Sequence, residues 1–209
     1  MGSRGFLTIA GAASALVLWV ACGPSAQTQG SAPAAPAAPV APLPLLPAHA
    51  LMGGSGLSWT APEGWQIETP SSSMRRAQYR IPASPGDPED AECGVFYFGV
   101  GQGGDVQGNV ERWASQFKGP EGAEAVPKVT EVRVGGLAVT EVELKGTYTP
   151  SQMGSPLESG GPKPGYMLLG AIVPGSGANW FFKCTGPEKT MEANRQRFGL
   201  MIASVYTTG

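Results

Sequence analysis

Short apolar stretches separated by turn residues fill the chain from residue 57 onward, and this spacing predicts a β-sheet. Residues 75–81 alternate apolar and polar positions, as half-buried strands do, whereas residues 93–99 are apolar throughout and predict a central strand. Gly135-Gly136 and residues 174–177 separate neighbouring stretches, which favours antiparallel hairpins. The predicted strands are residues 57–60, 65–67, 75–81, 93–99, 129–134, 137–148, 166–173 and 180–184.

Two further segments have apolar residues at helical spacing. Residues 105–117 begin at Asp105, a good N-cap, and residues 187–204 carry a proline in the tolerated first turn. Their apolar stripes are Val106, Val110, Trp113 and Phe117 in the first, and Met191, Phe198, Met201, Ile202 and Val205 in the second. We expect both stripes to pack on the sheet. The predicted fold class is therefore α+β, a mainly antiparallel β-sheet flanked by two helices.

The N-terminus has the organisation of an export signal. Arg4 precedes an apolar run at 6–20, which is shorter than the about 20 residues that span a bilayer. The run ends in Val20-Ala21-Cys22 and resembles the lipobox of bacterial lipoproteins, with Trp19 where such motifs usually have Leu. The resemblance implies a signal peptide at 1–21 and a lipid on Cys22. The alternatives are an ordinary secretory signal, with Cys22 inside the mature chain, or an uncleaved anchor.

Residues 22–56 have the composition of a linker. Residues 23–55 contain no Asp, Glu, Lys or Arg and carry seven prolines set mainly among alanines. Because each proline removes a backbone donor, we expect an extended tether of about 3 Å per residue. A PxxP-type ligand for another protein is the alternative. The predicted organisation is a signal peptide at 1–21, the lipid-attachment Cys22 with an Ala/Pro-rich linker to 56, and one domain at 57–209.

Composition excludes several classes of function. The net charge of −2 and the 14% of charged residues provide no basic surface for nucleic acid. The single histidine, His49, lies in the predicted linker, so the domain has no Ser-His-Asp or Cys-His arrangement, and we expect no enzymatic activity. A G-x-G-x-x-G match at 99–104 is followed by Asp105, which would repel a pyrophosphate, so we expect no nucleotide cofactor.

Two cysteines and an acidic segment are candidates for specific chemistry. Cys93 and Cys184 lie in predicted strands, and disulfides persist outside the cytoplasm, so we expect them to be bridged; two buried free thiols are the alternative. The acidic segment gathers four carboxylates within six residues, and such oxygens are ligands that Ca²⁺ prefers. A solvated loop is the alternative interpretation. The candidate ligands are Asp87, Glu89, Asp90 and Glu92.

A polar stripe borders the apolar face of the first predicted helix. It consists of Asn109, Arg112 and Gln116, and the Arg112 guanidinium has the geometry to hold a ligand carboxylate. The alternative is that these groups satisfy nearby backbone carbonyls.

Three stretches together resemble a known fold family. They are Trp59-x5-Trp65, Asn109-x-x-Arg-Trp113-x-x-Gln-Phe117, and Trp180-Phe-Phe-Lys-Cys-Thr-Gly-Pro187 followed by a helix. They resemble bacterial domains with the PsbP-like α/β/α sandwich, over about residues 57–206. The resemblance implies the fold, and family members bind proteins or, in some cases, metal ions. No functional residue of the family matches this sequence.

We therefore expect a lipid-anchored, non-enzymatic protein of the cell envelope that presents its domain to a protein partner. A module that binds a small ligand or a divalent metal is the alternative. Gly23 after Cys22 resembles outer-membrane sorting, so we expect an outer-membrane anchor that faces the periplasm.

Overall fold

The computed structural model describes residues 51–54, 56–150 and 161–208. The expected signal peptide, Cys22 and most of the expected linker lie outside the described residues. The elements are β1 (Leu51–Gly54), β2 (Leu57–Thr60), β3 (Gln66–Glu68), β4 (Arg75–Ile81), β5 (Ala91–Tyr97), α1 (Val106–Ala114), β6 (Phe117–Lys118), the 3₁₀-helix η1 (Pro120–Gly122), β7 (Lys128–Val134), β8 (Leu137–Tyr148), β9 (Lys163–Pro174), β10 (Asn179–Pro187) and α2 (Glu188–Ala203).

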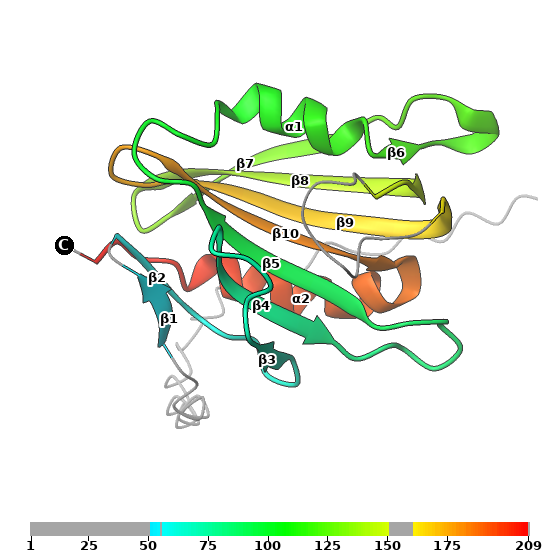
Figure 1. Cartoon of the computed structure of the whole chain (residues 1–209), viewed down its shortest axis with the longest axis horizontal. Coiled ribbons are helices and arrows are strands. Elements are labelled where there is room, and N and C mark those ends of the chain that lie inside the picture. Colours follow the sequence, from blue (N-terminus) through cyan, green and yellow to red (C-terminus); the bar gives the residue numbers. More distant parts are fainter. Residues whose placement is uncertain (1–50, 55, 151–160, 209) are drawn as a thin grey trace, which may run out of the picture. The chain divides into compact units, whose positions relative to one another are not determined.

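The main sheet of the described region has eight strands, and every pairing in it is antiparallel (Figure 1). Its order is β3-β4-β5-β10-β9-β8, and β8 pairs with both β6 and β7 along its other side. One helix lies on each face of the sheet (Figure 1). The predicted α+β class, a mainly antiparallel sheet with two helices, is confirmed. Within the described residues, neither helix is long and apolar enough to cross a membrane.

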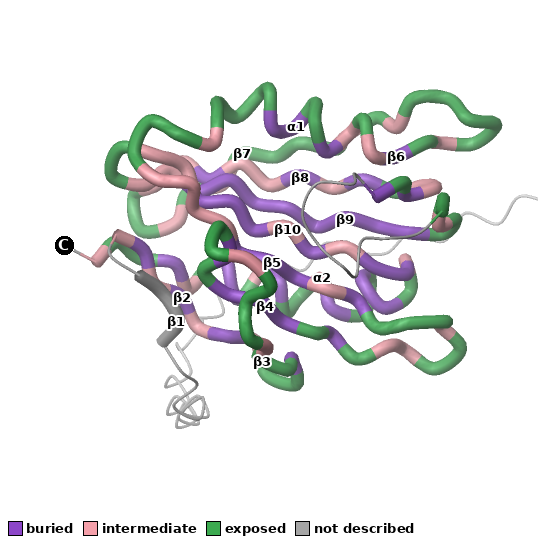
Figure 2. The backbone as a smooth tube through the Cα atoms, viewed as in Figure 1, coloured by how far each residue is buried: buried purple, intermediate pink, exposed green. Residues whose placement is uncertain are grey.

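The face that carries α2 holds the larger core, and the middles of the central strands are buried (Figure 2). Met191, Phe198 and Met201 of α2 pack there with aromatic side chains of the sheet such as Trp180. Cys93 of β5 and Cys184 of β10 are direct register partners on this face and form a disulfide. The predicted pairing of these two cysteines is confirmed, and both are fully buried.

The opposite face is covered by α1 only in part. Trp113 lies against Gly170 of β9, where a Cβ atom would be 2.5 Å from the Trp113 Cζ3. A nine-residue helix is about 14 Å long, and neighbouring strands are about 4.8 Å apart, so α1 covers only part of this sheet. The β4 and β5 side of the face is left without a helix.

The sequence misplaced several boundaries. β1 lies inside the expected linker and pairs with β2, so the β-structure begins before residue 57. The first helix ends at Ala114, and Phe117 belongs to the short strand β6 instead. Val106 remains partly exposed rather than packing on the sheet. Pro187 is the last residue of β10, and α2 begins one residue later.

Candidate functional site

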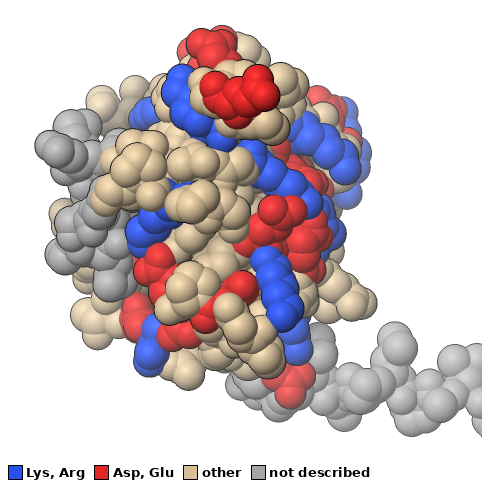
Figure 3. Space-filling model, turned by 90° about the vertical axis from the view of Figure 1, so that its right-hand side faces the viewer, with Lys and Arg blue, Asp and Glu red and all other residues tan. Residues whose placement is uncertain are grey.

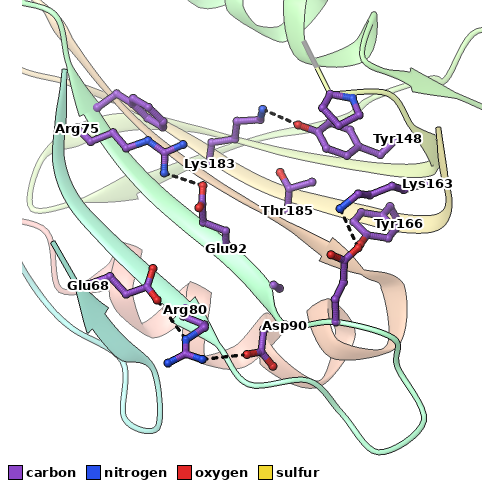
Figure 4. A pocket seen from close by; sticks show the side chains of 14 residues that line it. Glu68, Arg75, Arg80, Asp90, Glu92, Tyr148, Lys163, Tyr166, Lys183 and Thr185 are labelled. Carbon is purple, nitrogen blue, oxygen red and sulfur yellow. Dashed lines mark hydrogen bonds and ion pairs between the residues drawn. The ribbon is translucent and has the colours of Figure 1, made fainter. Parts of the chain in front are cut away.

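A cleft of about 250 Å³ opens on the half of the sheet that α1 leaves uncovered (Figure 4). Its floor follows from strand register. Arg80, Glu92 and Thr185 are direct neighbours across β4, β5 and β10. Lys183 lies two residues from Thr185 and so shares its face. Because successive side chains of a strand point to opposite faces, Cys93 and Cys184 point to the α2 side. The cleft and the disulfide therefore lie on opposite faces of the sheet.

Arg75 forms one wall of the cleft and is only 4% exposed. Its Nη1 donates to the Glu92 Oε1 at 2.6 Å and to the Gln78 Oε1 at 3.0 Å. The guanidinium also lies over the Phe96 ring, 5.1 Å from the centroid. A Cβ on Gly94 would be 2.7 Å from the Phe96 ring, so glycine at that position lets the arginine and the aromatic ring lie against the sheet.

Two polar atoms of the cleft residues are buried without a hydrogen-bond partner in the described part of the chain. They are the Arg75 Nε and the Thr185 Oγ1. Thr185 lies between the Arg75–Glu92 pair and the tyrosines of the other wall (Figure 4). A buried polar group without a partner costs about 1–3 kcal/mol, and such groups are rare in native proteins. Their occurrence in one cleft therefore calls for a functional explanation.

The other wall is aromatic and polar. The rings of Tyr148 and Tyr166 are stacked with centroids 6.0 Å apart. The Lys183 Nζ donates to the Tyr148 hydroxyl at 3.3 Å and to the Gln116 Oε1 at 2.9 Å. This arrangement extends an ammonium group along the cleft from the central strand β10.

A loop after β4 closes the end of the cleft through Glu89. Its carboxylate accepts hydrogen bonds from the Lys163 Nζ at 2.8 Å and from the Tyr166 hydroxyl. Burial alone would raise the pKa of Glu89, but these two hydrogen bonds outweigh it and the pKa is lowered. Burial and the neighbouring Glu89 carboxylate raise the pKa of Tyr166, so both groups keep their usual protonation states at neutral pH.

The charges that line the cleft balance. Arg75, Arg80, Lys163 and Lys183 are the cations, and Glu68, Glu89, Asp90 and Glu92 are the anions. The ion pairs are Arg75–Glu92, Arg80–Glu68, Arg80–Asp90 and Lys163–Glu89. Figure 3 shows basic and acidic side chains intermingled on one face of the molecule, with no large patch of either sign. Donors and acceptors thus alternate around a cleft that has no net charge.

The four acidic residues proposed as metal ligands do not converge. Asp87 caps α2, where its Oδ2 accepts from the Thr190 backbone N–H at 2.9 Å. Asp90 accepts from the Ala83 N–H at 2.7 Å, while Glu89 and Glu92 have the partners described above. No three His, Cys, Asp or Glu side chains among the described residues are placed to hold a metal ion. The predicted metal site is not assembled in this structure, because each carboxylate is already used to fix the loop or the cleft wall.

The three residues of the polar stripe on α1 also contact different partners. Asn109 is buried and donates to the carbonyls of Gly103 and Asp105 at 2.8 and 2.7 Å, which holds the glycine loop against the helix. Arg112 is exposed and donates to the Asn109 Oδ1. Only Gln116 reaches the cleft, through Lys183. The three residues therefore do not form the expected carboxylate site.

Sequence reasoning missed Arg75, Lys183 and Thr185. A usable signal was present for Lys183, which interrupts the apolar run Trp180-Phe-Phe-Lys-Cys184 in a strand that is mostly buried. No comparable signal marks Arg75, because its pairing with Glu92 depends on the register of two strands.

Solved structures with a distant similarity to this chain include the following three. No known family and no curated protein sequence matches the chain. A protein of unknown function from Pseudomonas aeruginosa, described as a putative regulator, is 14% identical with a TM-score of 0.46, over 75% of this chain and 99% of that one. LpqN of Mycobacterium tuberculosis, described as involved in cell envelope biogenesis, is 13% identical with a TM-score of 0.47, over 75% and 86%.

The third similar structure is cyanobacterial PsbP (CyanoP) from Synechocystis, at 11% identity and a TM-score of 0.46, over 73% of this chain and 87% of that one. It belongs to the fold family that the sequence resembles. At these values the similarities assign neither a family nor a ligand to this chain.

Proposed function

We propose that this protein is a non-enzymatic binding protein of the cell envelope, and that its cleft binds a small polar ligand with no net charge. The lipid on Cys22 would hold it in the outer membrane facing the periplasm, and the Pro-rich linker would separate the domain from the bilayer. The proposal favours the small-ligand alternative over the protein partner expected from the sequence.

The observation that carries the proposal is the pair of buried atoms without partners, the Arg75 Nε and the Thr185 Oγ1. Both atoms are closed off from solvent in the free protein, so a ligand hydroxyl or amide reaches them when neighbouring side chains move aside, and would then recover part of their desolvation cost. The charged side chains around these two atoms balance one another. A ligand with a net charge would therefore add a charge that no side chain of the cleft compensates, which disfavours such a ligand. The volume of about 250 Å³ lies just below the usual range of ligand pockets, which favours a small molecule or one unit of a larger one.

Two observations support the proposed location. The Cys93–Cys184 disulfide is typical of proteins outside the cytoplasm. The N-terminal charge, apolar run and Cys22 have the order of a lipoprotein signal. Mass spectrometry of the N-terminal peptide from native membranes would test the anchor, and an unmodified Cys22 would contradict it.

Ligand binding is tested by thermal unfolding of the full chain with a panel of small molecules. The panel contains neutral sugars, polyols and amides, with citrate and spermidine as charged comparisons. A ligand that binds only the folded state raises the melting temperature in proportion to the logarithm of its concentration. We expect a neutral compound to do so, and neither charged compound.

Two valine variants locate the response. Thr185→Val removes the unpaired hydroxyl at nearly constant shape and should abolish the response without lowering the stability of the free protein. Thr207→Val is the matched control at an exposed position near the C-terminus and should keep the response. A panel without any response, or an equal response in both variants, would contradict the proposal. A protein that co-purifies equally with wild type and Thr185→Val would favour the protein-partner role instead.

A further inference from the structure

Strand β7 forms an edge of the sheet that no other described strand covers. It has seven residues and pairs only with β8. Five of its residues are exposed, and Val129 is 50% exposed. An edge strand of this length presents a row of backbone donors and acceptors that can pair with another strand.

The turn after β7 determines which backbone groups point outward. Gly135 and Gly136 have φ values of 54° and 87°, as in the two-residue hairpin turns of type I′. Such a turn closes on a hydrogen-bonded pair, here Val134 with Leu137. Because hydrogen-bonded and non-hydrogen-bonded pairs alternate, the N–H and C=O groups of residues 129, 131 and 133 point away from β8.

Side chains on the two faces of β7 differ in character. Val132 and Val134 pack against the core on the α2 side. Glu131 and Arg133 project from the opposite face, are exposed, and have no ion pair or hydrogen bond with any described residue. The outward-facing strand therefore combines free backbone groups with one free acid and one free base.

Charge complementarity selects one way for two such strands to pair. In an antiparallel pair about a twofold axis, outward-pointing residues must oppose outward-pointing residues. With the axis at Val132, Glu131 of each copy lies opposite Arg133 of the other. Moving the axis by one residue places Glu131 opposite Glu131, or Arg133 opposite Arg133, and like charges directly opposite are destabilising.

We propose that β7 is a self-association edge, and that a second copy of this chain adds its own β7 in antiparallel register about Val132. The backbone groups of residues 131 and 133 of both copies would pair, and the two Glu131–Arg133 contacts would lie on the face away from α2. The sheet would then continue from one copy into the other. The contact is limited to one strand, so association is concentration-dependent and would be favoured when copies share a membrane. This inference does not depend on the ligand of the cleft.

Charge reversal tests the register. The full chain carries Cys22→Ser so that it is not lipidated, and its mass is followed by sedimentation velocity over a range of concentrations. We expect wild type to move from monomer to dimer as its concentration rises, and the single variants Glu131→Arg and Arg133→Glu to remain monomeric. The double variant with both reversals should recover the dimer, because it restores opposite charges in the same register. Arg197→Glu, at an exposed position of α2, is the control for net charge and should dimerise like wild type.

Cysteine cross-linking tests the axis directly. Val132→Cys places two sulfur atoms at a close, non-hydrogen-bonded pair and should give a disulfide-linked dimer under mild oxidation. Val129→Cys is more exposed than Val132 but lies away from the axis, and should cross-link far less. A monomer at all concentrations, single variants that dimerise like wild type, a double variant that stays monomeric, or equal cross-linking at both positions would each overturn the proposal.

Discussion

Removal of the Cys93–Cys184 disulfide is expected to cost a large share of the stability of the domain. The two cysteines are 91 positions apart in sequence, so the bond closes a long loop in the unfolded chain. The chain-entropy relation for a loop of that length gives about 4–5 kcal/mol at 25 °C. Typical domains are stable by about 5–15 kcal/mol, so the loss would leave a marginal protein. For a domain of this size it corresponds to a melting temperature lower by about 10–20 °C.

The comparison is between the full chain with Cys22→Ser and the same chain with Cys93→Ala and Cys184→Ala added. Guanidinium unfolding is followed by the fluorescence of tryptophans, among which Trp59 and Trp180 are buried in the same core as the disulfide. Because both cysteines are fully buried, loss of the sulfur atoms adds a small packing term to the entropic one. Reductant present throughout unfolding and refolding should bring the parent chain close to the variant and leave the variant unchanged.

A difference below about 1 kcal/mol between the two chains would refute the reasoning. It would mean that the unfolded chain already holds these strands together, so that the bond removes little entropy. An effect of reductant on the variant would likewise show that the change has a source other than this disulfide.

Three further outcomes follow from the packing and the charges. Gly170→Ala should destabilise the domain by about 1–3 kcal/mol in denaturant unfolding, because the added Cβ would lie 2.5 Å from Trp113. Gly199→Ala lies in a helix, and its added Cβ would have no atom within 4 Å, so it should stabilise the domain by up to about 1 kcal/mol. Hydrogen bonds from Arg195 and a neighbouring lysine lower the pKa of Glu192 from 4.5 to about 2, so this carboxylate stabilises the fold above pH 4.5 and loses that effect as the pH falls toward 2. Arg195→Met should reduce the dependence of the free energy of unfolding on pH between 4.5 and 2, measured in low salt. An unchanged pH dependence would contradict the role given to Glu192. Added calcium should leave the melting temperature unchanged, since the carboxylates of the acidic loop already have partners within the protein, and a saturable rise would contradict their assignment as structural groups.

The cleft shows how little of a binding surface local sequence specifies. Arg75 is paired with Glu92 across two strands, and Lys183 reaches Gln116 only because α1, which packs over β8 and β9, ends beside the cleft. The carboxylates of the acidic segment are separated for the same reason: Asp87 contacts Thr190, more than 100 positions away, and caps α2 instead of facing the other carboxylates. Residue types were visible in the sequence, but their partners were not.

The sequence by itself determined the fold class and most of the elements, although it did not predict β1 or β6. Short apolar stretches bounded by turn residues placed most of the strands, Gly135-Gly136 placed a hairpin, and Asp105 placed the start of α1, since its Oδ1 accepts from the Gly108 N–H at 2.7 Å. These features depend on backbone conformation and periodicity within a few residues, which a single stretch of chain encodes.

Only the tertiary structure decided strand order, register and the uncovered half of the sheet. β5 lies beside β10, although 81 residues separate Tyr97 from Asn179 in sequence order, and this pairing creates both the disulfide and the floor of the cleft. The extent of α1 relative to the width of the sheet then decides which polar side chains remain uncovered. These outcomes depend on packing among distant elements, and no local pattern records them.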